Sequence, residues 1–119
     1  MGHTYTKIKV YNRDLSRFEE VSLLVDTGST YSWISRDRLV NIGVVPVKVR
    51  KFKTIDGKSV EREIGEAVIE CMEERGTTVV VFAEKGDSEV LGVLALEGLA
   101  LEINPLTEEL KKTEALLAV

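Results

Sequence analysis

Short segments rich in β-branched and aromatic residues, each ending at a turn signal, run through most of this chain and constrain its fold more than any other feature. Strands are predicted at residues 5–11, 18–25, 31–34, 47–55, 60–71 and 77–83. Asp56-Gly57 is a strong hairpin signal between two of these segments. The 119 residues suit one domain, taken as residues 1–119. Many short strands with one or two short helices predict a mainly β domain that closes into a barrel-like shape.

Two helices are predicted from local signals. Ser35 is placed to cap a short helix over residues 36–40, with Gly43 as its terminator. The main helix is predicted at residues 93–101, where leucines are available for burial. Residues 107–112 fit either a capped helix start or a turn that leads into a final strand.

Charge and composition argue against several classes of function. The net charge is −4 and both signs are interspersed, unlike the basic stripe of a nucleic-acid binder or the polybasic segment of a membrane-surface protein. No apolar run is long enough to span a bilayer and the first residues lack a signal-peptide pattern, so a cytoplasmic protein is expected. The single histidine, His3, and the single cysteine, Cys71, are too few for a Cys/His zinc site or for a Ser-His-Asp or Cys-His arrangement. Cys71 and Trp33 are predicted to be core residues.

The most informative stretch of the sequence is Leu23-Leu24-Val25-Asp26-Thr27-Gly28-Ser29-Thr30. A carboxylate directly after three aliphatic residues is disfavoured in its charged form, so the site must supply hydrogen bonds or share a proton. Gly28 permits a tight turn that projects Asp26 from a strand end, and Ser29 can donate a hydrogen bond to a carboxylate. Taken alone, the tripeptide is interpreted as a strand followed by a turn that Asp26 caps.

Four features occur together and in order. Two aliphatic residues precede Asp26-Thr27-Gly28-Ser29, a hairpin follows at residues 52–60, the triplet Val90-Leu91-Gly92 leads into the predicted main helix, and Glu102-Ile103-Asn104-Pro105 precedes a polar turn. In these features the chain resembles the retropepsins, which are single-domain, retroviral-type aspartic proteases, and above all their microbial members. The hairpin corresponds to their flap. The resemblance covers nearly the whole chain.

The resemblance implies a homodimeric endopeptidase, because the chain has one Asp-Thr-Gly motif and is too short for two lobes. Two Asp26 carboxylates would share a proton, one activating a water and the other polarising the scissile carbonyl of a peptide or protein substrate. No metal or cofactor is implied. Thr27 would donate its hydroxyl to the backbone of the other subunit and Ser29 would tune the carboxylates. The catalytic set is Asp26, Thr27 and Gly28, and the substrate-binding set is Ser29, Thr30, Ile55, Asp56, Gly57, Lys58 and Val90.

The sequence departs from the retroviral pattern in two places. Thr30 and Val93 occupy the positions of an acidic residue and an arginine that help to join retroviral subunits, and the flap tip is charged instead of rich in glycine. Dimer affinity is therefore expected from another contact, the apolar residues Leu116 to Val119. The alternative function is a catalytically silent dimer of this fold that binds peptides or serves as an interaction module, followed by an unrelated β-barrel binding module.

Overall fold

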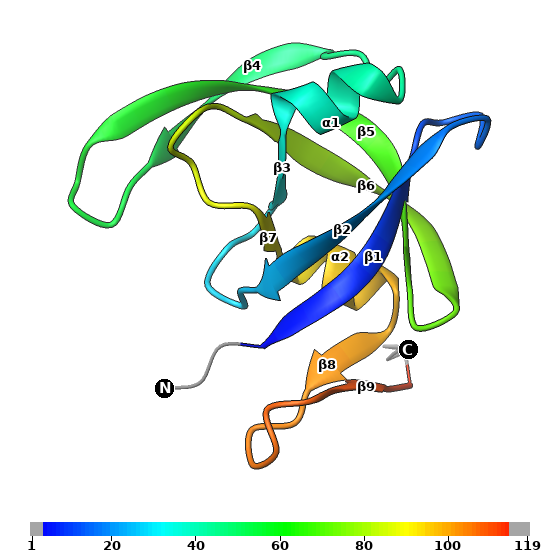
Figure 1. Cartoon of the computed structure of the whole chain (residues 1–119). Coiled ribbons are helices and arrows are strands. Elements are labelled where there is room, and N and C mark those ends of the chain that lie inside the picture. Colours follow the sequence, from blue (N-terminus) through cyan, green and yellow to red (C-terminus); the bar gives the residue numbers. More distant parts are fainter. Residues whose placement is uncertain (1–3, 115–119) are drawn as a thin grey trace, which may run out of the picture.

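The computed structural model describes residues 4–114 and is mainly β, with two short helices, which confirms the expected fold class at this level (Figure 1). The elements of this part of the chain are β1 (Tyr5–Tyr11), β2 (Phe18–Val25), β3 (Ser32–Ser35), α1 (Arg36–Asn41), β4 (Lys48–Lys53), β5 (Ser59–Cys71), β6 (Glu74–Ala83), β7 (Val90–Leu91), α2 (Val93–Gly98), β8 (Leu101–Ile103) and β9 (Leu110–Lys112). The last four apolar residues, 116–119, for which a dimer contact is expected, lie outside the described residues.

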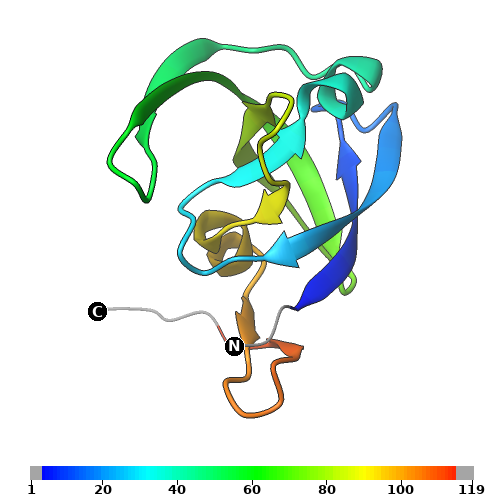
Figure 2. The same ribbon diagram turned by 60° about the vertical axis from the view of Figure 1, so that its left-hand side comes forward.

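The strands of the large sheet follow the order β1-β2-β7-β3-β6-β5-β4, and β1 also pairs with β5. The short strand β7 lies between β2, to which it is parallel, and β3, to which it is antiparallel. Beyond this sheet, β8 and β9 form a separate antiparallel pair. The strong curvature of the sheet, visible in Figure 2, allows β1 to pair on both of its edges. A fully closed barrel stays a prediction.

Alternation of apolar and polar residues explains which face of each strand is buried. In β2, Val21, Leu23 and Val25 are buried, whereas Ser22 between them is exposed. Because side chains alternate across a strand, these three residues point into the same core. Cys71 at the end of β5 is only 2% exposed and belongs to this core, as predicted. Burial raises the pKa of its thiol, as expected for an inert core cysteine.

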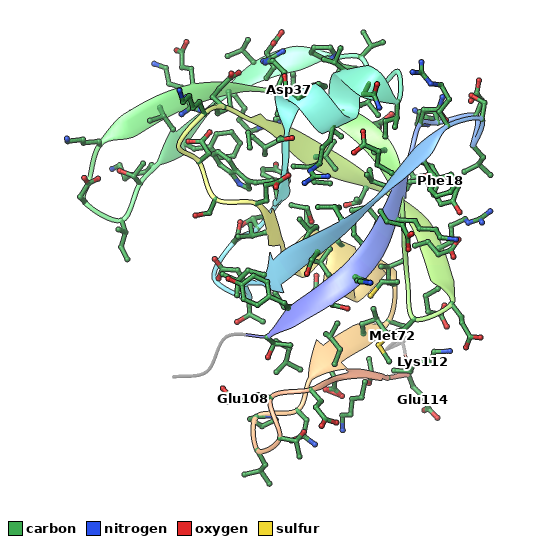
Figure 3. All side chains as sticks on the ribbon, in the orientation of Figure 1. Phe18, Asp37, Met72, Glu108, Lys112 and Glu114 are labelled. Carbon is green, nitrogen blue, oxygen red and sulfur yellow. The ribbon has the colours of Figure 1, made fainter. Side chains whose placement is uncertain are left out.

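The turn between β5 and β6 differs from the predicted one at residues 73–76. Met72 and Glu73 form it alone, with φ of 52° and 68°, and pairing resumes at once between Cys71 and Glu74. Positive φ at both central residues is typical of the tight hairpin turns that match strand twist. The side chain of Lys112 on β9 lies near this turn, 3.5 Å from Glu73 (Figure 3). The sequence signal pointed to Gly76 instead, which lies inside β6.

Both helices are short, and α2 ends earlier than predicted. Leu99 follows the helix as its C-cap and Ala100 has a φ of 54°, so the chain turns and Leu101 begins β8. The α1 prediction holds, since the Ser35 hydroxyl accepts a hydrogen bond from the Arg38 amide. The open choice at residues 107–112 is settled as a turn followed by β9. No helix within residues 4–114 has the length and apolar character needed to cross a membrane.

Candidate active site

Asp26 stands at the end of β2, where the strand gives way to a loop. The parallel register of β2 with β7 places Val25 beside Leu91, and the Asp26 amide donates to the Leu91 carbonyl at 3.0 Å. The aliphatic residues before Asp26 are therefore anchored in the sheet, and its half-buried side chain begins where pairing ends. A rigid strand end of this kind fixes a functional side chain more tightly than a loop does.

The Asp26 side chain caps its own turn. Its Oδ1 accepts a hydrogen bond from the Gly28 amide at 2.9 Å, and its carbonyl accepts one from the Ser29 amide at 3.1 Å. A Cβ on Gly28 would lie 3.2 Å from Oδ1, which is tighter than normal contact. Within the described residues, Oδ2 has no hydrogen-bond donor. The turn interpretation is therefore correct, and it leaves one carboxylate oxygen available for chemistry.

The Ser29 hydroxyl does not donate to the Asp26 carboxylate, although the sequence led us to expect this hydrogen bond. Its hydroxyl donates to the Tyr31 carbonyl at 2.7 Å, within the same loop. A serine hydroxyl has one proton, so it cannot donate to Asp26 at the same time. The expected donation to the carboxylate is therefore not made in this structure, because the hydroxyl proton goes to the Tyr31 carbonyl. In this structure Ser29 stabilises the loop and not the charge on Asp26.

The loop at residues 26–31 rests on the start of α2. The amide of Val93 donates to the Ser29 carbonyl at 2.8 Å, and that of Leu94 donates to the Thr30 carbonyl at 3.1 Å. Gly92 packs still closer, since a Cβ there would lie 2.4 Å from the Tyr31 carbonyl oxygen. The triplet Val90-Leu91-Gly92 thus supports the Asp26 loop directly.

Five of the predicted site residues line one open cleft. Asp26, Gly28, Ser29 and Val90 lie along one part of it, and Thr30 lines the adjoining part. These residues come from segments at least sixty positions apart in the sequence, brought together because β7 is inserted beside β2. Thr27 is exposed beside the cleft, and its side chain has no hydrogen bond within the described residues.

The predicted flap-tip residues Ile55 to Lys58 do not line this cleft, although Phe52, Lys53, Thr54 and Val60 of the same hairpin do. The hairpin of β4 and β5 stands on the same side of the molecule as the Asp26 loop in both views (Figures 1 and 2). Its tip is fully exposed at Ile55, and Asp56 accepts hydrogen bonds from the Thr54 hydroxyl and the Lys58 amide. The Thr54 hydroxyl lowers the pKa of the Asp56 carboxyl. Gly57 has a φ of 86°, which a turn of this kind requires.

An aromatic cluster lies where the two parts of the cleft meet, and the sequence did not reveal it. The ring of Phe52 lies 5.0 Å from that of Trp33 and 5.9 Å from that of Tyr31, centroid to centroid. Trp33 was predicted to be core, but it is half-buried and lines the cleft, because β3 turns its other face toward the core. Alternation along β4 brings Arg50 and Phe52 to the same face, which is the signal that could have found them.

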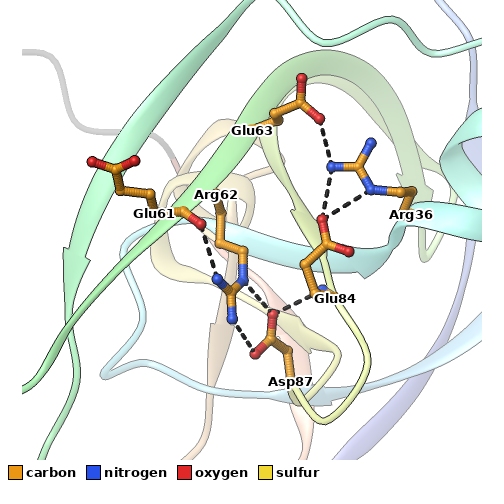
Figure 4. A network of polar contacts seen from close by, with 6 residues as sticks. All are labelled: Arg36, Glu61, Arg62, Glu63, Glu84 and Asp87. Carbon is orange, nitrogen blue, oxygen red and sulfur yellow. Dashed lines mark hydrogen bonds and ion pairs between the residues drawn. The ribbon is translucent and has the colours of Figure 1, made fainter.

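A polar network joins the β4–β5 hairpin to the loop that precedes β7 (Figure 4). The Arg62 guanidinium on β5 binds the Asp87 carboxylate through two hydrogen bonds, of 2.7 and 3.0 Å. Both side chains are less than one-fifth exposed, and Asp87 also accepts from the Glu84 amide. The Arg62 guanidinium holds the pKa of the Asp87 carboxyl below its usual value. Since Asp87 also lines the cleft beside Asp26, this pair fixes one wall of the candidate site.

Asp87→Asn is expected to lower the free energy of unfolding by about 1.5–3 kcal/mol at pH 7, because it leaves Arg62 without its charged partner. The folded-state pKa of Asp87 lies below the unfolded value of about 3.9, so its contribution is complete above that pH. The contribution is lost as the pH falls through the folded-state pKa. Denaturant unfolding of both proteins between pH 7 and pH 2 should therefore show two curves that converge in acid.

Asp37→Asn provides the matched control for this measurement. Asp37 is exposed on α1 and has no ion pair within the described residues (Figure 3). Its replacement should cost at most about 1 kcal/mol, the value of a charge near a helix N-terminus. If Asp87→Asn is no more destabilising than this control at pH 7, the Arg62–Asp87 pair is not a structural tie.

No family model matches the chain, and the search of curated proteins found no significant match. Among residues 4–114, no group of three or more histidine, cysteine or acidic side chains is placed to hold a metal ion.

Proposed function

We propose that this chain is an aspartic endopeptidase of the retropepsin type that acts as a homodimer. The observation that carries the proposal is the placement of Asp26. Its carboxylate is fixed through Oδ1 by the Gly28 amide and lies in an open cleft, with Oδ2 available to a water or to a second carboxyl group. A closed barrel of the retropepsin kind is part of the proposal, and the pairing of β1 with both β2 and β5 supports it.

The proposed reaction needs two carboxyl groups, and the chain has one Asp-Thr-Gly motif. A two-fold axis beside the exposed Thr27 and Gly28 would bring Asp26 of each subunit next to its copy. Two adjacent carboxyl groups do not both ionise readily, so the pair holds one proton. The ionised member accepts a proton from the attacking water, and the protonated member donates a hydrogen bond to the scissile carbonyl.

The tip of the β4–β5 hairpin would cover the substrate in the proposed dimer. In the structure the tip residues Ile55 to Lys58 stand clear of the cleft, and the tip is held together by its own hydrogen bonds. We propose that the tip closes over a peptide once two subunits form the complete site. Thr27 would use its free hydroxyl to bind the partner's backbone, as the retropepsin resemblance implies.

The proposal is tested by incubating the protein with an unfolded protein substrate at acid pH, with and without a pepstatin-like inhibitor. Fragments are expected in the absence of the inhibitor and are expected to disappear in its presence and in the Asp26→Asn variant. Sedimentation at micromolar concentration should show a dimer. No cleavage by a dimeric protein would favour the silent peptide-binding dimer. A strictly monomeric protein that still cleaves would contradict the shared site.

A further inference from the structure

The Arg50 guanidinium faces the candidate cleft and forms no ion pair with a carboxylate among residues 4–114. Arg50 lines the part of the cleft that adjoins Asp26, and its guanidinium lies 5.8 Å from the centre of the Tyr31 ring. The Nε atom of Arg50 is buried and has no hydrogen-bond partner in the part of the chain that the structure describes. A buried N–H group without an acceptor is costly, so a turn of the Arg50 side chain that brings Nε to an acceptor on a ligand is favoured.

The charged residues that line the cleft around Arg50 are all cations. Arg62 is directly opposite Arg50 in the β4–β5 register, but its charge is matched by Asp87. Lys51 and Lys53 also line this part of the cleft, and no acidic residue does. Asp26 and Asp87 line the adjoining part, together with Trp33 and Phe52. The charged residues of the part around Arg50 are therefore all cations, whereas the part that holds Asp26 carries both signs, because Lys53 lines it as well.

We infer that this cleft selects peptides that carry a glutamate or aspartate a few residues from the cleaved bond, with Arg50 binding the acidic side chain. An arginine can hold a carboxylate through two parallel hydrogen bonds, which would give Nε its acceptor. The rings of Phe52, Trp33 and Tyr31 line the cleft that also holds Arg50 and Asp26, and they offer an apolar surface suited to aromatic or aliphatic side chains of the peptide. The inference takes the cutting of the peptide from the proposed function, whereas the binding preference stands without it.

Binding can be measured apart from cleavage, because Trp33 is the only tryptophan of the chain and lines the cleft. Two tryptophan-free peptides serve as probes, acetyl-Ala-Glu-Phe-Phe-Glu-Ala-amide and its counterpart with both glutamates changed to glutamine. Each is titrated at pH 6 into the Asp26→Asn protein while Trp33 fluorescence is followed. The glutamate peptide is expected to bind about tenfold more tightly, the equivalent of one charge-assisted hydrogen-bonded pair.

Three variants of the same protein identify the residue responsible. Arg50→Glu should abolish or reverse the preference for the glutamate peptide, and Arg50→Lys should keep only part of it, since lysine lacks the planar fork. Lys7→Glu is the control for net charge, because Lys7 is exposed on β1 outside the cleft, and it should retain the preference. The preference should also vanish below about pH 4, where the glutamates of the peptide become protonated.

Cleavage of the same two peptides by the unmodified protein, followed by mass spectrometry, completes the test. A ratio of kcat/KM that favours the glutamate peptide and collapses in Arg50→Glu supports both the inference and the proposed function. Preferential binding of the glutamate peptide without any cleavage supports the inference and rejects the enzyme. Equal binding of the two peptides, no binding of either, or a preference that survives Arg50→Glu overturns the inference, whether or not the protein cleaves peptides.

Discussion

An equal mixture of wild-type and Asp26→Asn chains, allowed to exchange subunits, is expected to retain about a quarter of the activity of the same amount of wild-type protein. If pairing is random, half of the dimers are mixed and a quarter carry two asparagines. A mixed dimer has one carboxyl group at its centre and cannot provide both the base and the acid. Only the wild-type pairs then act, and activity follows the square of the wild-type fraction.

The variant is chosen so that folding and pairing are preserved. Asparagine is close to isosteric with aspartate and keeps a side-chain oxygen, so the Gly28 amide retains its acceptor. Asp26→Asn homodimers should lose at least about a hundredfold in activity, since proton transfer by a positioned carboxyl group contributes at that level or above. Circular dichroism and sedimentation should match those of the wild-type protein.

Asp14→Asn is the control for this mixing experiment. Asp14 is exposed in the turn between β1 and β2 and accepts a hydrogen bond from the Ser16 amide, which the asparagine oxygen can also do. Mixtures of wild-type and Asp14→Asn chains should keep full activity at every ratio. A linear fall with Asp26→Asn, to about half at equal amounts, would show that each chain contains a complete site.

Local sequence signals identified most strands and helices, because the alternation of a strand and the residues that end a helix are properties of a short segment. The bounds of β1 and β2 agree with the prediction, since alternation along each strand marks its buried face. Ser35 and Gly43 mark the ends of α1 as predicted, with Gly43 at a φ of 86°. The turn at Met72 and Glu73 was missed because its positive φ angles fall on residues that rarely adopt them.

The candidate site was predicted only as far as its motif reaches. Asp26 and the residues beside it were found from the sequence, but the hydrogen bond from Ser29 to Tyr31 depends on how the loop folds. Insertion of β7 between β2 and β3 is a long-range pairing, which no local pattern specifies. For the same reason the approach of Arg50 to Tyr31 could not be predicted from either segment alone.

Gly92→Ala is expected to displace the loop that carries Asp26 and to lower the free energy of unfolding by about 3 kcal/mol or more. The added Cβ would lie 2.4 Å from the carbonyl oxygen of Tyr31 and 2.8 Å from that of Ser29. Both contacted atoms belong to the backbone of the loop that carries Asp26, so they cannot move away by a side-chain rotation. The loop must therefore shift, and its hydrogen bonds from Val93 and Leu94 weaken with it.

Gly98→Ala is the matched control, at the other end of the same helix. Apart from its two neighbours and the backbone of its own helix, no atom among residues 4–114 lies within 4 Å of a Cβ added at Gly98, so alanine fits there without strain. Alanine also favours the helix over glycine by about 0.5–1 kcal/mol, so this variant should be slightly more stable than the wild-type protein. Thermal unfolding followed by circular dichroism should separate the two variants by roughly 10 °C or more.

Activity adds a second readout to this comparison. A displacement of about 1 Å at a catalytic group can cost a hundredfold in rate, so a Gly92→Ala protein that still folds should be nearly inactive while Gly98→Ala keeps its activity. The two readouts separate fold from function, because the loss of stability follows from packing alone and the loss of activity requires the proposed role of Asp26. If Gly92→Ala proves as stable as Gly98→Ala, then the loop does not rest on Gly92 as described, and the support of Asp26 must come from its own turn and from β7.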